Sequence, residues 1–402
     1  MPQNWKTYKL TDLGTIARGK SKHRPRDASH LYGGKYPFIQ TGDVKAANHR
    51  LNNHTQTYSE AGLAQSKLWP ENTMCITIAA NIAETAILEY PACFPDSIIG
   101  FIADETKCDI DYVEYLMQFF KKQIQTHSIG SVQDNINLGT FQRVEFTVPP
   151  LPEQKSIASI LSALDDKIEL NLQMNKTLEE MAMALYKHWF VDFGPFQDGE
   201  FIDSELGEIP KGWKIKKLPE ISKSHNKKRK PLSTRERAKR QGVYPYYGAT
   251  KILDYIDEYR FEGEFILLAE DGTVKTERDT PYLQFVEGKF WVSNHAHVLS
   301  GKEEYSNEFL YLCLNNKNVI PIITGAVQLK INKQNLESLE FIVPPKEDLK
   351  LFEKIIIPYF KYQKFISKEN LSLVNLRDFL LPKLISGEIR VKDLEKTLTE
   401  VL

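Results

Sequence analysis

A phosphate-binding pattern near the N-terminus is the first candidate for chemistry. Residues Gly14–Ser21 read GTIARGKS and match the G-x-x-x-x-G-K-S spacing of nucleotide-binding loops. Such a loop follows an apolar strand and opens a helix. Here the preceding TYKLTDL is short and polar, and Pro25 stands where the helix should run. The match is therefore interpreted as accidental, and no ATP site is predicted.

Other residue types suited to catalysis or metal binding are scattered along the chain. His295 and His297 could share one face of a strand, but no cysteine or carboxylate cluster accompanies them, so a polar contact is favoured over a metal site. The four cysteines form no CxxC pair, which indicates reduced thiols. The two Val-Pro-Pro sequences lack the Asn or Asp and the aromatic residue of an adenine-methyltransferase loop. No catalytic residue and no metal ligand is predicted.

Basic residues are concentrated in two segments, although the formal net charge of the chain is only -1. One is ARGKSKHRPR, Ala17–Arg26, and the other is KSHNKKRKPLSTRERAKR, Lys223–Arg240. Lys and Arg displace counterions along a nucleic-acid backbone, so both segments are predicted to contact phosphates of a nucleic acid; the alternative is a solvated loop with no partner. The predicted contacts are Lys20, Lys22, Arg24, Arg26, Lys227, Lys228, Arg229, Lys230 and Arg235.

Candidates for reading bases lie in further segments. Gln and Asn suit adenine, Arg suits guanine, and Ser or Thr suit either base. Each candidate could instead be a turn residue or a strand cap. The predicted DNA-binding residues of this kind are Gln40, Thr41, Ser131, Gln133, Asn135, Tyr246, Tyr247, Gln328 and Lys330.

The two basic segments occupy equivalent places in an internal repeat. MPQNWKTYKL at the start resembles IPKGWKIKKL at residues 209–218, and YPFIQTG from Tyr36 resembles YPYYGAT from Tyr244. Later, GSVQDNINLGTFQRVEFTVPP from Gly130 resembles GAVQLKINKQNLESLEFIVPP from Gly325. The early matches lie 208 positions apart and the late ones 195, so the second copy is shorter in its middle. We infer a duplication.

A long helix is predicted after each Val-Pro-Pro. Seam positions alternate at spacings of four and three, as in a coiled coil, and the residues between them are polar. Asn175 and Asn370 fall at equivalent seam positions, so the helices are predicted to pair with Asn near Asn. The first helix is expected to span about 34 residues, or about 50 Å, and to end at Gly194 and Pro195; Gly387 is expected to cap the second. The predicted seam residues are Leu164, Ile168, Asn175, Leu178, Tyr359, Ile366, Asn370 and Leu373.

The predicted fold class is α+β, with two similar mixed α/β domains separated by two long antiparallel helices and related by a pseudo-twofold. A chain of 402 residues is long enough for several domains. No secretory signal and no membrane-spanning run is found, so a cytoplasmic location is expected. The predicted parts are residues 1–150 and 213–345 (globular domains), 151–193 and 346–388 (helices), 194–212 (linker) and 389–402 (a tail that closes back toward the N-terminal domain).

The segment VPPLPEQKSIASILSALDDKIELNLQMNKTLEEMAMALYKHWFVDF, residues 148–193, resembles the central region of specificity subunits of type I restriction–modification systems. LRDFLLPKLISGEI, residues 376–389, is also typical of that family, whereas VPPKEDLKLFEKI, residues 343–355, lacks the Glu-Gln. The missing Glu-Gln suggests that the two junctions serve partner subunits unequally.

The resemblance implies a function beyond what the residues show. Such subunits are non-catalytic, and each of their two target-recognition domains reads one half of a split site in double-stranded DNA. Their helices act as a ruler, here about 15 base pairs, and dock two methyltransferase (M) subunits and, where present, restriction (R) subunits. The resemblance implies that this chain binds no cofactor. S-adenosylmethionine for adenine-N6 methylation, and ATP with Mg for restriction, would belong to the partners. The alternatives are a stand-alone DNA-modifying enzyme with an unrecognised active site and a scaffold that only joins proteins.

Overall fold

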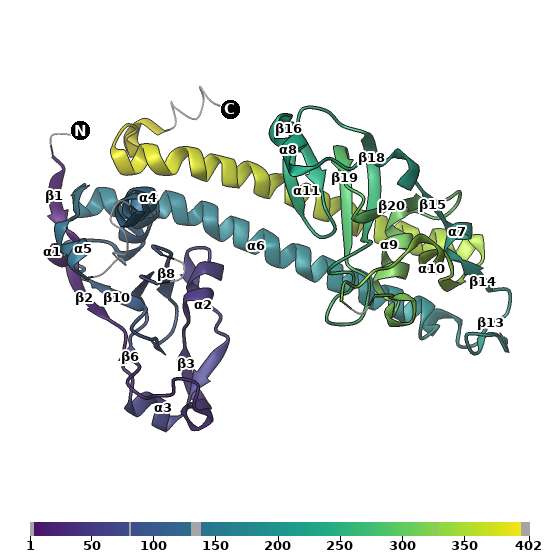
Figure 1. Cartoon of the computed structure of the whole chain (residues 1–402), viewed down its shortest axis with the longest axis horizontal. Helices are drawn as coiled ribbons and strands as arrows, with labels where there is room; N and C mark the ends of the chain where they lie inside the picture. The colour runs from purple at the N-terminus through teal and green to yellow at the C-terminus, as the bar shows by residue number, and fades with distance from the viewer. Residues whose placement is uncertain (1–3, 80–81, 130–137, 326, 395–402) are drawn as a thin grey trace. The chain divides into compact units, whose positions relative to one another are not determined.

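The computed structural model describes residues 4–79, 82–129, 138–325 and 327–394 (Figure 1). The chain divides into two compact units, residues 1–172 with 368–402 and residues 173–367. Each unit holds a mixed α/β domain together with parts of both long helices, α6 (Leu151–Phe190) and α11 (Lys346–Ser386). In the described part of the chain, no helix is both long and apolar enough to cross a bilayer.

The first unit is built on a five-stranded sheet of order β2-β10-β7-β8-β4 and a four-stranded sheet of order β5-β3-β9-β6. Strands β7 and β8 are buried along their whole length, in agreement with their mainly apolar sequences. The elements are β1 (Lys6–Lys9), α1 (Leu10–Leu13), β2 (Gly14–Arg18), β3 (Tyr32–Phe38), α2 (Thr41–Ala46), β4 (Arg50–Leu51), β5 (Gln56–Tyr58), α3 (Glu60–Ala64), β6 (Leu68–Trp69), β7 (Met74–Thr77), β8 (Thr85–Leu88), β9 (Ala92–Cys93), β10 (Ile98–Ala103), α4 (Ile110–Ile129), α5 (Leu138–Arg143) and β11 (Glu145–Val148).

The second unit contains a six-stranded sheet of order β15-β20-β18-β19-β16-β17. Gly263 and Gly288 face each other across β18 and β19, and both have positive φ, a conformation that glycine adopts without steric cost. The elements are β12 (Phe201–Ile202), β13 (Ile209–Pro210), β14 (Lys214–Lys217), α7 (Leu218–Ile221), β15 (Ser222–Ser224), α8 (Thr234–Ala238), β16 (Gln241–Tyr247), β17 (Ile252–Ile256), β18 (Phe261–Ala269), β19 (Leu283–Val292), β20 (Ala296–Gly301), α9 (Asn307–Asn315), α10 (Lys333–Glu337) and β21 (Glu340–Val343).

The duplication is visible in the strand register. In the first unit β1 pairs antiparallel with β11, with Lys6 opposite Val148. In the second unit β14 pairs with β21, with Lys214 opposite Val343. Lys6 and Lys214 are 208 positions apart, and Val148 and Val343 are 195 apart. The two offsets found in the sequence therefore belong to the two strands of one antiparallel pair. Equivalent residues face each other in both copies.

Helix α6 is longer than the sequence indicates. It contains 40 residues, about 60 Å of helix, and ends at Phe190, before Gly194 and Pro195. Gly194 and Pro195 begin a short 3-10 helix, Gly194–Phe196. Helix α11 contains 41 residues and ends at Ser386. Gly387 follows with φ of +73°, so its expected role as the C-cap is confirmed.

The two helices pair within each unit, but Asn175 and Asn370 do not meet. In the first unit the Asn171 amide donates to Asn370 Oδ1 at 2.8 Å and to Glu369 Oε2 at 2.7 Å. In the second unit Asn175 Nδ2 donates to Ser367 Oγ at 3.3 Å. The expected Asn175–Asn370 contact is wrong because the helices are antiparallel. A step forward along α6, from Asn171 to Asn175, is a step backward along α11, from Asn370 to Ser367.

The predicted seam residues occupy the interior side of these helices. Ile168, Ile366 and Asn370 are buried, while Leu164, Asn175, Leu178, Tyr359 and Leu373 are half-buried.

Each unit completes its core with the start of one long helix and the end of the other. In the first unit, Ile157 and Leu161 from α6 join Leu380 and Leu384 from α11 in the core under the five-stranded sheet. The C-terminal segment belongs to the same unit, because Arg390 Nε donates to Glu153 Oε1 at 2.7 Å. In the second unit, Tyr186 and Phe190 from α6 join Phe352 and Ile356 from α11.

A buried charged cluster supports α4 in the first unit. His49 is 4% exposed, with Nδ1 2.7 Å from Glu114 Oε2 and Nε2 3.0 Å from Asp111 Oδ1. Burial alone lowers the pKa of His49, but the hydrogen bonds to Asp111 and Glu114 and their negative charge raise it to about 9. The ring stacks on Tyr115, whose hydroxyl donates to Asp165 of α6 at 2.7 Å. The sheet, α4 and α6 are thus joined through polar groups.

Removal of one seam asparagine should destabilise the first unit. Asn171→Leu leaves Asn370 Oδ1 without its donor, and an unsatisfied buried polar group costs about 1–3 kcal/mol. The double variant Asn171→Leu/Asn370→Leu should recover part of this loss, because two apolar residues then face each other. Thermal unfolding of the purified chain should give the highest Tm for wild type, a lower Tm for the double variant and the lowest Tm for the single variant. Equal Tm values for the two variants would contradict it.

The His49 cluster should make stability depend on pH. The pKa of His49 is about 9 in the folded chain and about 6.5 when unfolded. Its contribution is therefore fully present below pH of about 6.5 and is lost as pH rises through about 9, a change on the order of 3 kcal/mol. The Tm difference between wild type and His49→Gln should shrink between pH 6 and pH 10. Parallel curves over this range would refute the assignment.

Candidate nucleic-acid interface

The second basic segment presents its lysines on short, well-capped elements. Residues Asn226–Lys228 form a 3-10 helix, and α8 begins after Ser233, whose hydroxyl accepts from Glu236 N. The side chains of Lys227, Lys228, Lys230 and Arg235 are exposed. Within the described residues none of these four forms an ion pair. Their charge is therefore not neutralised within the described part of the domain, and their contact with phosphates stays a prediction.

Arg229 differs from its neighbours. Its guanidinium donates from Nη1 to Glu270 Oε2 at 2.7 Å and to Ala296 O at 2.7 Å. Its side chain is only 15% exposed. The structure therefore gives Arg229 a different role from the predicted phosphate contact, because its charge is already neutralised inside the domain. It ties the basic segment to the start of β20.

Glu270 organises this end of the domain. Besides Arg229, it lies 3.5 Å from Lys330 Nζ and 3.7 Å from His297 Nδ1. Burial alone raises the pKa of Glu270, but the hydrogen bond from Arg229 and the positive charges of Arg229 and Lys330 hold it below its usual value. Glu270 therefore stays ionised, and it joins the basic segment to the segment that carries Lys330.

The two histidines of the SNHAHV sequence do not share a strand face. His295 precedes β20 and contacts Asp271 through Nδ1 at 2.8 Å. His297 is buried, and burial lowers its pKa, so it is neutral. It donates from Nε2 to Ile331 O at 2.8 Å and accepts at Nδ1 from the Asn226 amide. Across the described residues no cluster of potential metal ligands occurs, and the polar-contact interpretation describes both side chains.

The shared G-x-V-Q motif of the second unit lies between two residues, Thr324 and Lys330, whose backbones pair. Thr324 and Lys330 exchange both backbone hydrogen bonds at 2.8 Å, and Ile331 N donates to Glu270 O at 2.9 Å. Gly325 has φ of +91°, and a Cβ there would lie 2.1 Å from Gln328 O, so only glycine fits. Val327 is 103% exposed, and Gln328 is also exposed. The loop therefore holds an apolar and an amide side chain in solvent.

Other predicted base-reading residues are less accessible. Tyr246 is 1% exposed and contacts Leu232 N through its hydroxyl, so it is a core residue that cannot reach a base. Tyr247 is half-buried against Phe290. Gln40 and Thr41 are half-buried at the start of α2, where Gln40 is the N-cap residue. The predicted residues Ser131, Gln133 and Asn135 lie outside the described residues.

In the first unit the basic segment is partly used by the fold. Lys20 and Lys22 are exposed. Arg24 donates to the carbonyls of Ser21 and His23 at 2.8 Å, and Arg26 pairs with Asp96 at 2.9 Å. Both arginine side chains remain exposed enough to exchange these contacts for a phosphate.

The P-loop-like sequence lies in the same part of the first unit. Residues Gly14–Arg18 form strand β2, and the residues that follow form no α-helix until α2. The sequence therefore lacks the strand–loop–helix context of a nucleotide site, in agreement with the interpretation of the match as accidental.

The Glu-Gln sequence is absent from the second junction. In the first junction it has a structural role. Gln154 is 1% exposed; it accepts from Asp109 N at 3.0 Å and donates to Pro149 O at 2.9 Å. Its counterpart Leu349 is also buried, within the apolar core of the second unit. A buried amide cannot touch a partner subunit. The difference between the junctions therefore reflects how each domain packs.

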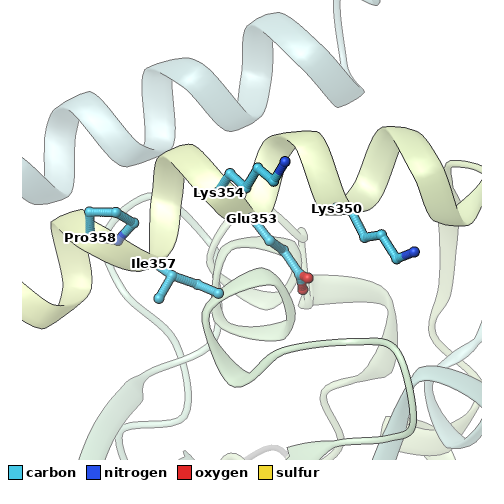
Figure 2. A pocket seen from close by; sticks show the side chains of 5 residues that line it. All are labelled: Lys350, Glu353, Lys354, Ile357 and Pro358. Carbon is cyan, nitrogen blue, oxygen red and sulfur yellow. The ribbon is translucent and has the colours of Figure 1, made fainter.

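A groove runs along one face of α11 in the second unit (Figure 2). Figure 2 shows Lys350, Glu353, Lys354, Ile357 and Pro358 projecting from this single helix. Glu353 Oε1 accepts from Ser306 N at 2.9 Å. The groove is open and is not an enclosed pocket for a small substrate. Nearby on α11 the exposed apolar residues are Leu351, Ile355, Tyr362 and Phe365.

Comparison with known proteins identifies the family. A family model described as type I restriction modification DNA specificity domain matches residues 2–180 and 210–373. The chain belongs to the family of type I restriction–modification specificity subunits. The two matched segments are the two copies of the repeat, so this specificity subunit has two target-recognition domains.

Related proteins and one solved structure resemble the chain over nearly its whole length. The MjaIX specificity subunit of Methanocaldococcus jannaschii is 27% identical, covering 98% of this chain and 95% of that protein. The HindI specificity subunit of Haemophilus influenzae is 23% identical, covering 96% of this chain and all of that protein. The crystal structure of the S subunit from M. genitalium shares the fold, with a TM-score of 0.59 at 16% identity over 95% of this chain and 96% of that chain.

Two residues of this specificity subunit were missed by the sequence-based prediction. Glu270 follows the fully apolar end of strand β18, and an acidic residue at such a place signals a buried pairing. Val327 lies inside the repeated G-x-V-Q motif. An apolar residue within a loop is the feature of the sequence that could have drawn attention to it.

Proposed function

We propose that this chain is the non-catalytic subunit that reads a bipartite target in double-stranded DNA, one half with each target-recognition domain. The observation that supports this proposal most directly is that Lys227, Lys228 and Lys230 are exposed. Arg229 of the same segment is instead paired with Glu270. A rigid surface with unpaired lysines is suited to phosphate contacts. The duplication supplies a second, equivalent domain for the other half-site.

The proposal extends to partners. The exposed apolar residues of α11 in the second unit, with the groove of Figure 2 beside them, are a surface on which a methyltransferase subunit would dock. The family resemblance supplies the identity of this partner. S-adenosylmethionine, and ATP with Mg where a restriction subunit takes part, would be bound by the partners, and adenine-N6 methylation would occur there.

The lysines provide the direct test of DNA contact. In a complex assembled with methyltransferase subunits, the triple variant Lys227→Ala/Lys228→Ala/Lys230→Ala should bind target DNA more weakly. The slope of log K against log salt should fall by about 0.9 for each phosphate that is no longer neutralised, so by about 2–3 in all. Salt titration of binding measures this slope.

Arg229→Ala is the matched control for the lysine variants. It should lower the Tm of the free chain, because it leaves the Glu270 carboxylate without its arginine partner. The salt slope should stay close to that of wild type. If the lysine variants kept the wild-type slope, the proposed phosphate contacts would be refuted.

Helix length should set the spacing between the two half-sites. Insertion of one heptad into both α6 and α11 adds about 10 Å of helix, which corresponds to about three base pairs of duplex. The methylated site, mapped by sequencing of modified DNA, should keep both half-sites and gain a longer spacer. Changed half-sites with a constant spacer would overturn the role of the helices as a ruler.

A further inference from the structure

The Val327–Gln328 tip is exposed although the loop that carries it is firmly anchored. A valine with 103% of its reference surface in solvent gains nothing from the fold, because burial is what makes an apolar side chain stabilising. On each side of the tip the backbone is bound: Thr324 to Lys330, and Leu329 O to Gly272 N at 3.0 Å. The exposed tip is therefore carried by a loop whose two ends are hydrogen-bonded within the domain.

The tip also lies beside positive charge. Lys330, at the base of the loop, is 48% exposed and shares Glu270 with Arg229 of the basic segment. The loop and the basic segment are thus both bound to Glu270 in the second unit, the loop through Lys330 and the basic segment through Arg229. A protein-docking surface would need a broad apolar patch, whereas here a single exposed valine and an amide lie close in sequence to Lys330.

We propose that the Val327–Gln328 tip reads one A·T base pair in the major groove of the half-site bound by the second target-recognition domain. This inference rests on the proposed function. The adenine N6 amino group would donate to Gln328 Oε1, and Gln328 Nε2 would donate to adenine N7. The Val327 methyl groups would contact the C5-methyl group of the paired thymine. Such a tip selects a base pair, whereas the neighbouring lysines contact any sequence.

The hydrogen-bonded base of the loop is the physical reason that the tip is suited to selection. A bidentate contact discriminates between bases only if the amide is held at a defined angle and depth. Gly325 permits the tight turn, since a side chain there would strike Gln328 O at 2.1 Å. The paired backbones of Thr324 and Lys330 fix the base of the loop. Little conformational entropy is then lost when DNA binds.

Modified bases test the proposal in the complex of the full chain with methyltransferase subunits. Each A·T pair of the mapped half-site is replaced in turn, with 7-deazaadenine to remove N7 and with uracil to remove the thymine methyl. At one pair, 7-deazaadenine should weaken wild-type binding by about 5-fold or more, as expected when a base loses its hydrogen bond. It should have no further effect on Gln328→Ala. Uracil at that pair should weaken wild type but not Val327→Ala.

Gln334→Ala is the control, because Gln334 is an exposed glutamine on α10 outside the tip. It should respond to both modified bases as wild type does. If wild type were insensitive at every A·T pair, or if Gln328→Ala weakened binding to all sequences equally, the tip proposal would be overturned while the bipartite target remained. A wild-type complex without sequence preference would overturn the proposed function and the tip proposal together.

Discussion

The contact between Phe190 and Phe352 is the interaction on which the second unit depends. The two rings meet edge to face with centroids 4.6 Å apart, and Phe309 and Trp213 pack on Phe190 from the surrounding domain. Phe190 ends a helix that begins in the first repeat, and Phe352 lies near the start of the helix of the second. The folding unit is therefore not the sequence repeat, since each core needs residues from both long helices.

The helices use different chemistry in the two units. In the first unit buried polar contacts accompany the apolar ones, with Asn171 on Asn370 and Arg377 Nη1 on Asp165 Oδ1 at 2.7 Å. Buried polar contacts of this kind add little stability, but they penalise every register in which they are unmatched. In the second unit the aromatic cluster supplies apolar area. Apolar contacts thus occur in both units, and the buried Asn171–Asn370 pair adds register to those of the first.

The charged residues of the candidate interface are of two kinds: some are paired inside the domain, and others keep their charge in solvent. Glu270 neutralises Arg229 and approaches Lys330, which fixes the segments that carry the exposed lysines and the Val327–Gln328 tip. A largely buried carboxylate with two cationic partners is stable where a lone one would not be. The lysines left outside this network keep their charge. An internal ion pair thereby prepares a surface that can meet a polyanion.

The amino-acid sequence by itself determined the duplication, the two long helices, the basic segments and the family, because identity between copies, heptad spacing and local charge are written in consecutive residues. It also placed the C-cap at Gly387. Only the tertiary structure decided which cations are free, since the partner of Arg229 lies 41 residues away at Glu270. It likewise decided that Asn370 faces Asn171, that Tyr246 is core and that Gln154 is buried. These outcomes depend on which segments meet in space, and spacing along the chain does not encode that.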